Sequence, residues 1–441
     1  MPGACGLGLL LALLLLPMVS ASRPGTVFRL NKEVLSYAAE AGKAPLQRAL
    51  QVTVPLFLDR SGGVFQPTRI QILNVDVSHL RLTFVANFGI RLLAATNFTL
   101  KIFRDPEPLH LLLPTALLAD TSVEQGSIGT PLVSISSCFS IFDKAIVFDG
   151  RNSTAPAMLA PLQSHIKAVL QSKLCLRISN LVQGLNVHLG TLIGLSPVGP
   201  ESQVRYSMIN TPTITNDYIS LDINAVLFLL GRPIVLPVDT TPFVLPQHVG
   251  TKGAMATVGL SQDLFDSAIM LLQKAGALNL DVTAQLVARQ FPEPMPLVLK
   301  VRLGATPTVT FRTNNATMRL QPFVEVLAPT SNSAFQYLFS LNVVVNLSLQ
   351  LSVSKVRLRG TTSVLGNVQL TVASSNLGFI DTDHVQTVMG EVFEKPLLDH
   401  LNALLGMGIA LPHVVNLQYV TPEIFIQEGY VVVSSGLLYQ R

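Results

Sequence analysis

The side chains that most often do catalytic chemistry are scattered through this chain of 441 residues. Its eight histidines fall in no HExxH zinc motif, and no GxSxG turn presents a nucleophilic serine. No glycine-rich run leads from a strand into a helix, so nothing supports a nucleotide site. We therefore expect no enzyme, no cofactor and no metal centre. The histidines are His79, His110, His165, His188, His248, His384, His400 and His413.

The most suggestive polar cluster is Asp381, Asp383 and His384. Two carboxylates and an imidazole could hold a cation. The same residues stand directly before a helical pattern, where an aspartate commonly caps the helix N-terminus. The capping role is favoured over a metal site.

Cys138 and Cys175 are predicted to form a disulfide. The third cysteine, Cys5, lies in a segment that we expect to be removed, which leaves an even number. A bridge between residues 37 apart would stabilise the fold by roughly 3–4 kcal/mol in the chain-entropy model. The alternative is two free, buried thiols. Neither cysteine has a CxxC partner, which favours a structural bridge over redox chemistry.

Residues 1–21 are interpreted as a secretory signal peptide. The apolar run Leu7–Leu16 is too short to span a membrane, and the small residues Val19–Ala21 follow it where signal peptidase cuts. The usual Lys or Arg before the run is missing. We expect a secreted, extracellular protein. Asn-X-Ser/Thr sequons agree with export and predict N-glycosylation at Asn97, Asn152, Asn315 and Asn346.

The composition is unusually apolar. Hydrophobic residues make up 49% and charged residues only 13% of the chain, which excludes a disordered protein. The net charge of +4 is too small and too dispersed for a nucleic-acid partner. The chain has no Trp, so contact with a membrane would depend on its 21 Phe and 7 Tyr and on aliphatic loops. We expect transient membrane contact at most.

Four segments have apolar residues at helical spacing, and long alternating strand patterns separate them. The expected helices are Asn31–Gln51, with Asn31 as its cap, Ala155–Asn186, Ser261–Ala277 and Asp383–Leu405. The first two begin 124 residues apart and the last two 122 apart, which indicates an internal duplication.

Matching motifs extend the duplication. Thr211-Pro212 leads to a strand at Tyr218, and Thr421-Pro422 leads to a strand at Tyr430. Between the halves, residues 231–250 are rich in proline and predict an extended linker. The expected domains are residues 22–230 and 251–441. Both contain helices and antiparallel strands, which predicts an α+β fold with a twisted sheet around a long helix in each half.

Small residues on the helix stripes, such as Ala38, Ala41, Ala268 and Ala275, fill space poorly beside a large sheet. The pattern allows an apolar cavity of the kind that takes a lipid tail. A large, dry core explains it equally well.

Several motifs resemble the BPI/LBP/PLUNC/CETP lipid-transfer superfamily, over nearly the whole mature chain. In the first half they are Gly25–Asn31, Gly42–Leu50, Cys138, Cys175 and Tyr218–Phe228. In the second half they are Val258–Ser261, Ala373–Gly378 and Leu411–Tyr439. Leu181–His188 and Phe291–Pro296 resemble the long members of BPI fold-containing family B.

The resemblance implies a boomerang of two barrels joined by a central sheet, with an apolar lipid pocket in each half. It also implies that the disulfide ties the long second helix to a strand. Two departures matter. At Lys101–Pro108, Asp105 and Glu107 largely cancel the cations, which puts lipopolysaccharide recognition in doubt. Leu286–Arg289 joins directly where relatives have a longer polar stretch, so the second pocket could be altered.

We expect a secreted, non-enzymatic binder or carrier of phospholipid-like amphiphiles, with tails between helix and sheet. The alternative is an innate-immunity protein that recognises bacterial glycolipid (lipopolysaccharide) or a protein partner through a weakly basic tip. The expected residues of the first pocket are Leu30, Val34, Ala38, Leu46, Leu162, Ile166 and Val169. Those of the second pocket are Leu264, Phe265, Ala268, Leu272, Val388, Val392 and Phe393.

Overall fold

The computed structural model describes residues 25–58, 67–103, 108–147, 160–233, 243–286, 295–330, 334–378 and 382–440. The expected signal peptide, Asn152 and Asp381 lie outside these ranges, as do residues 104–107 of the expected tip and residues 287–289 of the shortened segment.

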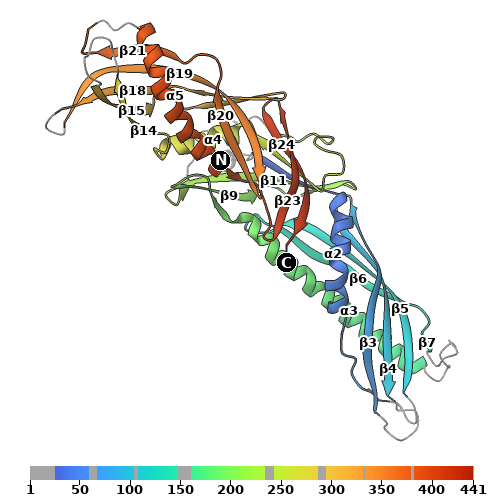
Figure 1. Ribbon diagram of the computed structural model, residues 1–441. Helices are drawn as coiled ribbons and strands as arrows, with labels where there is room; N and C mark the ends of the chain where they lie inside the picture. Colours follow the sequence, from blue (N-terminus) through green and yellow to red (C-terminus); the bar gives the residue numbers. More distant parts are fainter. Residues whose placement is uncertain are drawn as a thin grey trace, which may run out of the picture.

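The molecule is elongated, and its two halves extend in opposite directions from a central sheet (Figure 1). Strands dominate, and four long helices pack on them. The predicted α+β fold with a central sheet is confirmed. The helices are α2 (Glu33–Ala49), α3 (Ala160–Leu189), α4 (Gln262–Lys274) and α5 (Thr382–Met407).

The central sheet contains strands from both halves. Its order is symmetric about the neighbouring strands β1 and β13, because β11 and β9 lie on one side where β24 and β23 lie on the other. The register repeats the symmetry, since Asn31 pairs with Tyr218 and Ser261 pairs with Tyr430. The structure therefore confirms the predicted duplication. Along the sheet the strands are β23 (Leu417–Gln427), β24 (Tyr430–Tyr439), β13 (Ala256–Ser261), β1 (Thr26–Asn31), β11 (Tyr218–Leu229), β9 (Ser202–Met208) and β8 (Leu195–Pro197), with β10 (Thr213–Ile214) and β12 (Arg232–Pro233) on β11.

Each half adds an antiparallel sheet of its own, and the alternation of buried and exposed residues along these strands orients one face toward a helix. The N-terminal sheet contains β2 (Phe57–Leu58), β3 (Pro67–Val85), β4 (Gly89–Phe103), β5 (Leu109–Gln125), β6 (Pro131–Phe142) and β7 (Ile146–Val147). The C-terminal sheet contains β14 (Leu280–Leu286), β15 (Met295–Leu303), β16 (Thr308–Arg312), β17 (Asn315–Leu320), β18 (Pro322–Pro329), β19 (Phe335–Ser354), β20 (Arg357–Val364), β21 (Gln369–Ser375) and β22 (Ile409–Ala410).

The four predicted helices are present, but Asn31 does not cap the first one. The cap position belongs to Lys32, which has helical backbone angles and makes no capping hydrogen bond through its side chain. The Asn31 amide instead donates to the Ala254 carbonyl at 2.9 Å and to Thr257 Oγ1 at 3.1 Å, across the central sheet. The Asn31 side chain therefore makes a tertiary contact instead of the helix cap that the local sequence pattern predicts.

The described part of the expected linker lies against the central sheet. Phe243 and Leu245 are buried together with Val27 and Val432. The guanidinium of Arg29, itself buried, donates to the carbonyls of residues 245, 246 and 247 at 2.8–3.3 Å. These contacts fix the segment that connects the halves.

The buried apolar residues form two main clusters. One fills the far end of the N-terminal half, between α2, α3 and the N-terminal sheet, around residues such as Phe98 and Leu170. The other is continuous from Phe84 in the N-terminal half to Phe311 in the C-terminal half. The two helix–sheet interfaces are therefore the places where a ligand could lie inside the fold.

Candidate functional site

In the N-terminal half, α3 buries a narrow stripe against the sheet. The buried residues follow an i, i+4 spacing: Leu162, Ile166, Leu170, Leu174 and Ile178. The stripe does not continue to the end of the helix, because Leu181 is 38% exposed and Leu185 is 45% exposed where α3 extends beyond the core.

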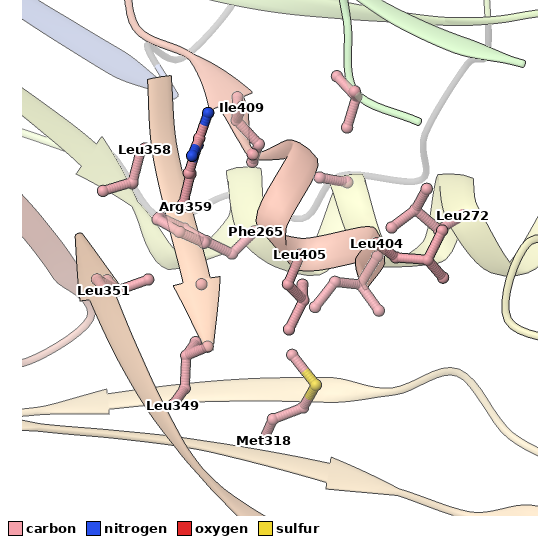
Figure 2. A pocket seen from close by; sticks show the side chains of 15 residues that line it. Phe265, Leu272, Met318, Leu349, Leu351, Leu358, Arg359, Leu404, Leu405 and Ile409 are labelled. Carbon is pink, nitrogen blue, oxygen red and sulfur yellow. The ribbon is translucent and has the colours of Figure 1, made fainter. Parts of the chain in front are cut away.

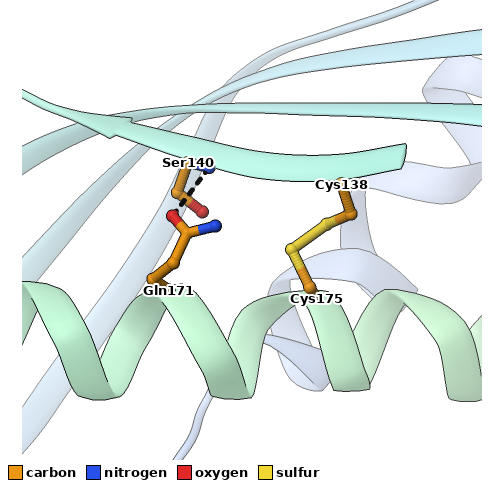
Figure 3. The surroundings of a disulfide bond; sticks show 4 residues. All are labelled: Cys138, Ser140, Gln171 and Cys175. Atoms are coloured by element: carbon orange, nitrogen blue, oxygen red, sulfur yellow. Dashed lines mark hydrogen bonds between the residues drawn. A yellow bond between two sulfur atoms is a disulfide. The ribbon is translucent and has the colours of Figure 1, made fainter.

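Three ties hold α3 along β6. The predicted disulfide between Cys138 and Cys175 is present, with the two Cα atoms 5.8 Å apart (Figure 3). One turn away, Gln171 Oε1 accepts a hydrogen bond from the Ser140 backbone N–H at 2.9 Å. Near the other end of the helix, the Asn186 side chain accepts from the Val133 N–H and donates to the Val133 carbonyl, both at 2.8 Å.

Among the described residues, a small cavity lies beneath α3. This cavity of about 10 Å³ is lined by side chains from β4, β5, residue 145 and α3, among them Leu100, Leu111 and Ile166. This volume is enough for one water molecule at most. As described, the N-terminal interface is a closely packed core.

The residues expected in the first pocket do not all meet. Leu46, Leu162 and Ile166 are buried in the N-terminal cluster, and Val169 packs against it. Leu30 and Val34 pack against the other cluster, because β1 and the start of α2 lie at the centre of the molecule. Ala38 is half-buried on α2.

In the C-terminal half, a larger apolar cavity of about 50 Å³ lies between α4, the end of α5 and the sheet (Figure 2). Among the cavities described beneath the helices, this one has more room than the N-terminal one, although it is below the range usual for ligand pockets. Its lining residues are Val198, Phe265, Ala268, Ile269, Leu272, Met318, Leu349, Leu351, Leu358, Arg359, Gly360, Leu404, Leu405, Gly408 and Ile409.

Three of the residues expected in the second pocket, Phe265, Ala268 and Leu272, line this cavity. Leu264 is buried in the same core but does not line the cavity. Val388, Val392 and Phe393 belong to α5, in the part whose side chains lie outside the described residues. The sequence did not predict that Arg359 and the strand residues of this cavity, such as Leu349 and Leu358, would line it. Alternation identifies the inward face of a strand but not the helix that covers it.

Polar side chains also tie the C-terminal helices to strands. The Asn402 side chain on α5 accepts from the Thr362 N–H at 2.7 Å and from its hydroxyl at 2.8 Å, and donates to its carbonyl at 3.2 Å. On α4, Asp266 accepts from the Val309 N–H at 2.8 Å. Burial raises the pKa of Asp266, and the hydrogen bond from Val309 opposes this shift.

Arg357 closes the C-terminal end of α5. It donates to the carbonyl of Met407 at 2.6 Å and to those of Gly408 and Pro197 at 2.8 and 2.5 Å. A cation is favourable at this end of a helix, where the last carbonyls lack partners. Burial lowers the pKa of Arg357, and the charge of Arg359 lowers it further.

A polar cleft of about 630 Å³ lies at the junction of the halves, around Arg29, Lys32, Asp217 and Lys252. Lys32 and Asp217 form an exposed ion pair at 2.6 Å, and the Arg29 guanidinium is occupied by the carbonyls of the connecting segment. Burial lowers the pKa of Arg29. These contacts are structural, and the acidic residues Glu33 and Asp217 offset two of the three cations that line the cleft.

The described sequon residues lie on the surface. Asn315 and Asn346 are exposed, and Asn97 is partly exposed on an outward-facing position of β4. Across the described ranges, no three His, Cys, Asp or Glu side chains gather as metal ligands would. None of the helices in the described part is long and apolar enough to cross a membrane.

Comparison with known proteins places the chain in a family. The family profile named LBP / BPI / CETP family, N-terminal domain, matches residues 34–185, and the profile of its C-terminal domain matches residues 198–439. The chain is 72% identical to human BPI fold-containing family B member 2 and 59% identical to the mouse protein of that name, with 100% of each chain covered in both cases. The chain is similar to the crystal structure of lipopolysaccharide binding protein, with a TM-score of 0.62 and 20% sequence identity. The superposition covers 95% of this chain and 100% of that chain. The predicted resemblance to the lipid-transfer superfamily and to its family B branch is confirmed.

Proposed function

Because the chain belongs to the LBP / BPI / CETP family, we propose that it is a secreted, non-enzymatic binder of phospholipid-like amphiphiles. The observation that carries the proposal is the apolar cavity of about 50 Å³ between α4, α5 and the C-terminal sheet. Its side chains are almost all aliphatic or aromatic, so it favours an alkyl chain over a polar solute.

The cavity must widen to admit a lipid tail. Leu404 and Leu405, on the last turns of α5, form one wall. In the described residues, the side-chain hydrogen bonds that hold this end of α5 come from Asn402, Arg357 and His400. A shift of these turns away from α4 would enlarge the space, and the tail would then replace helix contacts with contacts of its own.

The N-terminal interface is the second proposed site, and it would require a larger rearrangement, because its cavity is about 10 Å³. Native mass spectrometry of the secreted protein, followed by organic extraction, tests the proposal for both halves. We expect co-purifying lipid and uptake of a fluorescent phospholipid. A protein without bound lipid that takes up none would contradict the proposal.

Recognition of bacterial glycolipid is the alternative function. One observation favours it: at the far end of the N-terminal sheet, Arg69 and Lys101 both lie over the Phe103 ring, at 5.1 and 5.0 Å. Two cations beside an aromatic ring could contact a phosphorylated sugar. Salt-sensitive binding to lipid A that is lost when Lys101 and Arg104 are replaced by Ala would support this function over lipid carriage.

A further inference from the structure

Arg359 is a charged residue at the edge of an otherwise apolar cavity. It lies on β20 beside Leu358, which is buried and lines the cavity. Figure 2 shows the nitrogen atoms of Arg359 directed away from the side where Phe265 and Leu405 lie. The stem of the side chain packs near Gly408, where a Cβ added to the glycine would come within 3.0 Å of Arg359 Cγ.

The charge of Arg359 is uncompensated within the described part of the chain. The ion pairs found there involve Lys32, Lys43, Arg91 and Arg302, and no hydrogen bond of the Arg359 guanidinium is present among the described residues. Arg359 is exposed to solvent, so its five donors are open to water and to a ligand.

The neighbouring Arg357, two residues earlier on β20, donates to the carbonyls at the end of α5. Residues two apart on a strand share a face, so Arg357 and Arg359 lie on the same side of β20, and the charge of Arg359 lowers the pKa of Arg357. Arg359 is the charged residue among the residues that line this otherwise apolar cavity.

We infer that Arg359 binds the anionic head group of an amphiphile whose alkyl tail occupies the C-terminal cavity. The inference rests on the proposed lipid-binding function and narrows it to ligands with a phosphate or carboxylate next to the chain. A guanidinium suits either group, because its fork of donors matches two oxygen atoms at once. Arg359 selects the ligand by charge, and the apolar walls hold the tail.

The test uses competition against N-phenyl-1-naphthylamine, an uncharged fluorophore that reports on apolar sites. The competitors are a lysophosphatidate, a fatty acid and a monoacylglycerol with the same acyl chain, each below its micellar concentration. The secreted, full-length protein is compared with the Arg359→Gln variant. Arg312→Gln removes the same charge from an exposed position of the same half and serves as the control. Arg359→Lys retains the charge but not the fork.

We expect the wild type to bind the lysophosphatidate about tenfold more tightly than the monoacylglycerol, as a charge-assisted contact at a partly exposed site would give. Arg359→Gln should bring this ratio close to one without changing the affinity for the monoacylglycerol. Arg312→Gln should leave the ratio unchanged, and Arg359→Lys should keep part of it. A fatty acid that behaves like the lysophosphatidate would show that charge is recognised, and one that behaves like the neutral lipid would restrict recognition to phosphate.

The outcomes separate this inference from the function on which it rests. Equal wild-type affinities for charged and neutral lipids, or a ratio that survives Arg359→Gln, would overturn the role of Arg359 while lipid binding stands. Failure of every amphiphile to displace the fluorophore would instead overturn the proposed function.

Discussion

The two long helices α3 and α5 cover their sheets in the same manner but are fastened differently. On α3, the disulfide, Gln171 and Asn186 hold three points along β6, and the cavity beneath is about 10 Å³. On α5, Asn402 holds β20 and Arg357 holds the helix end, and the cavity beside it is about 50 Å³. Among the described cavities, the one beside α5 is therefore larger than the one beneath α3, although neither holds a lipid tail without widening.

An asparagine side chain bonds each helix to a strand in both halves, so the disulfide is the main difference between the attachment of α3 and that of α5. Asn186 and Asn402 each bind the N–H and the carbonyl of a single strand residue. A covalent tie limits the opening of α3 even if its hydrogen bonds break, whereas α5 depends on hydrogen bonds alone in the described part of the chain. Opening of α5 is therefore the easier route to a lipid site.

Removal of the disulfide should have the largest effect. Replacing Cys138 and Cys175 together by Ala frees a chain segment of 37 residues and should lower the stability of the N-terminal half by about 4 kcal/mol. Calorimetry should show a lower melting temperature, and hydrogen exchange should rise along α3 and β6 more than along α5 and β20. Lipid retention should fall more in the first half than in the second.

The control for this prediction is Ser136→Ala on an exposed position of β6, which should behave like the wild type. Equal melting temperatures for the wild type and the double variant, or free thiols at both positions of the secreted protein, would contradict it.

The second prediction concerns the hydrogen bonds by which Asn402 and Asn186 attach their helices to the strands. Asn402→Ala leaves the N–H and carbonyl of Thr362 without their partners and should cost about 2 kcal/mol. Asn186→Ala should cost less, because the disulfide keeps α3 near β6. In the variant without the disulfide, Asn186→Ala should cost as much as Asn402→Ala. Urea unfolding of the wild type, Asn186→Ala, the disulfide-free variant and its Asn186→Ala form measures this coupling, and Asn402→Ala provides the reference cost. An equal cost in both backgrounds would show that the bridge and the Asn tie act independently.

The third prediction tests the difference in space directly. Ala268 lines the C-terminal cavity and Ala145 lines the N-terminal one. Ala145→Leu should destabilise by about 1–3 kcal/mol, because the added methyl groups have no room, whereas Ala268→Leu should cost under about 1 kcal/mol. Ala268→Leu should also weaken lipid uptake. Denaturation midpoints and phospholipid uptake provide the measurements, and equal costs at the two sites would argue against the difference between the halves.

The sequence predicted the helices, because spacing along one element records its buried face. It predicted the duplication from the matching distances between the helices, and the disulfide from the even number of cysteines left after Cys5. It failed where a distant element decides the outcome. Asn31 bonds across the central sheet instead of capping α2, and Leu30 and Val34 lie at the centre of the molecule. Arg359 is visible in the sequence only as a cation next to an inward Leu, and its exposure to the cavity depends on how α5 ends.

The smallest expected effect concerns α4, which is held to β16 by the carboxylate of Asp266 as well as by the amide of Gln262. Burial raises the pKa of Asp266 above its ordinary value of 3.8, so the folded protein holds this proton more tightly than the unfolded chain. Stability from this group is therefore full below pH 3.8 and is lost as the pH rises through the raised pKa. Asp266→Asn keeps an acceptor for the Val309 N–H and removes the titration.

The Asp266→Asn variant should consequently gain a few tenths of a kcal/mol over the wild type at neutral pH, a small gain because the carboxylate is partly screened by solvent. This gain should shrink as the pH falls toward 3.8, where the wild-type carboxyl is protonated. Urea midpoints between pH 4 and pH 7 measure the trend, and Asp399→Asn, at an exposed position of α5, removes the same charge as a control. A variant less stable than the wild type at neutral pH would mean that the charged hydrogen bond to Val309 outweighs the desolvation of Asp266. In that case the hydrogen bond from Val309 to Asp266 would hold α4 in place on β16. Widening of the C-terminal cavity would then depend on movement of α5.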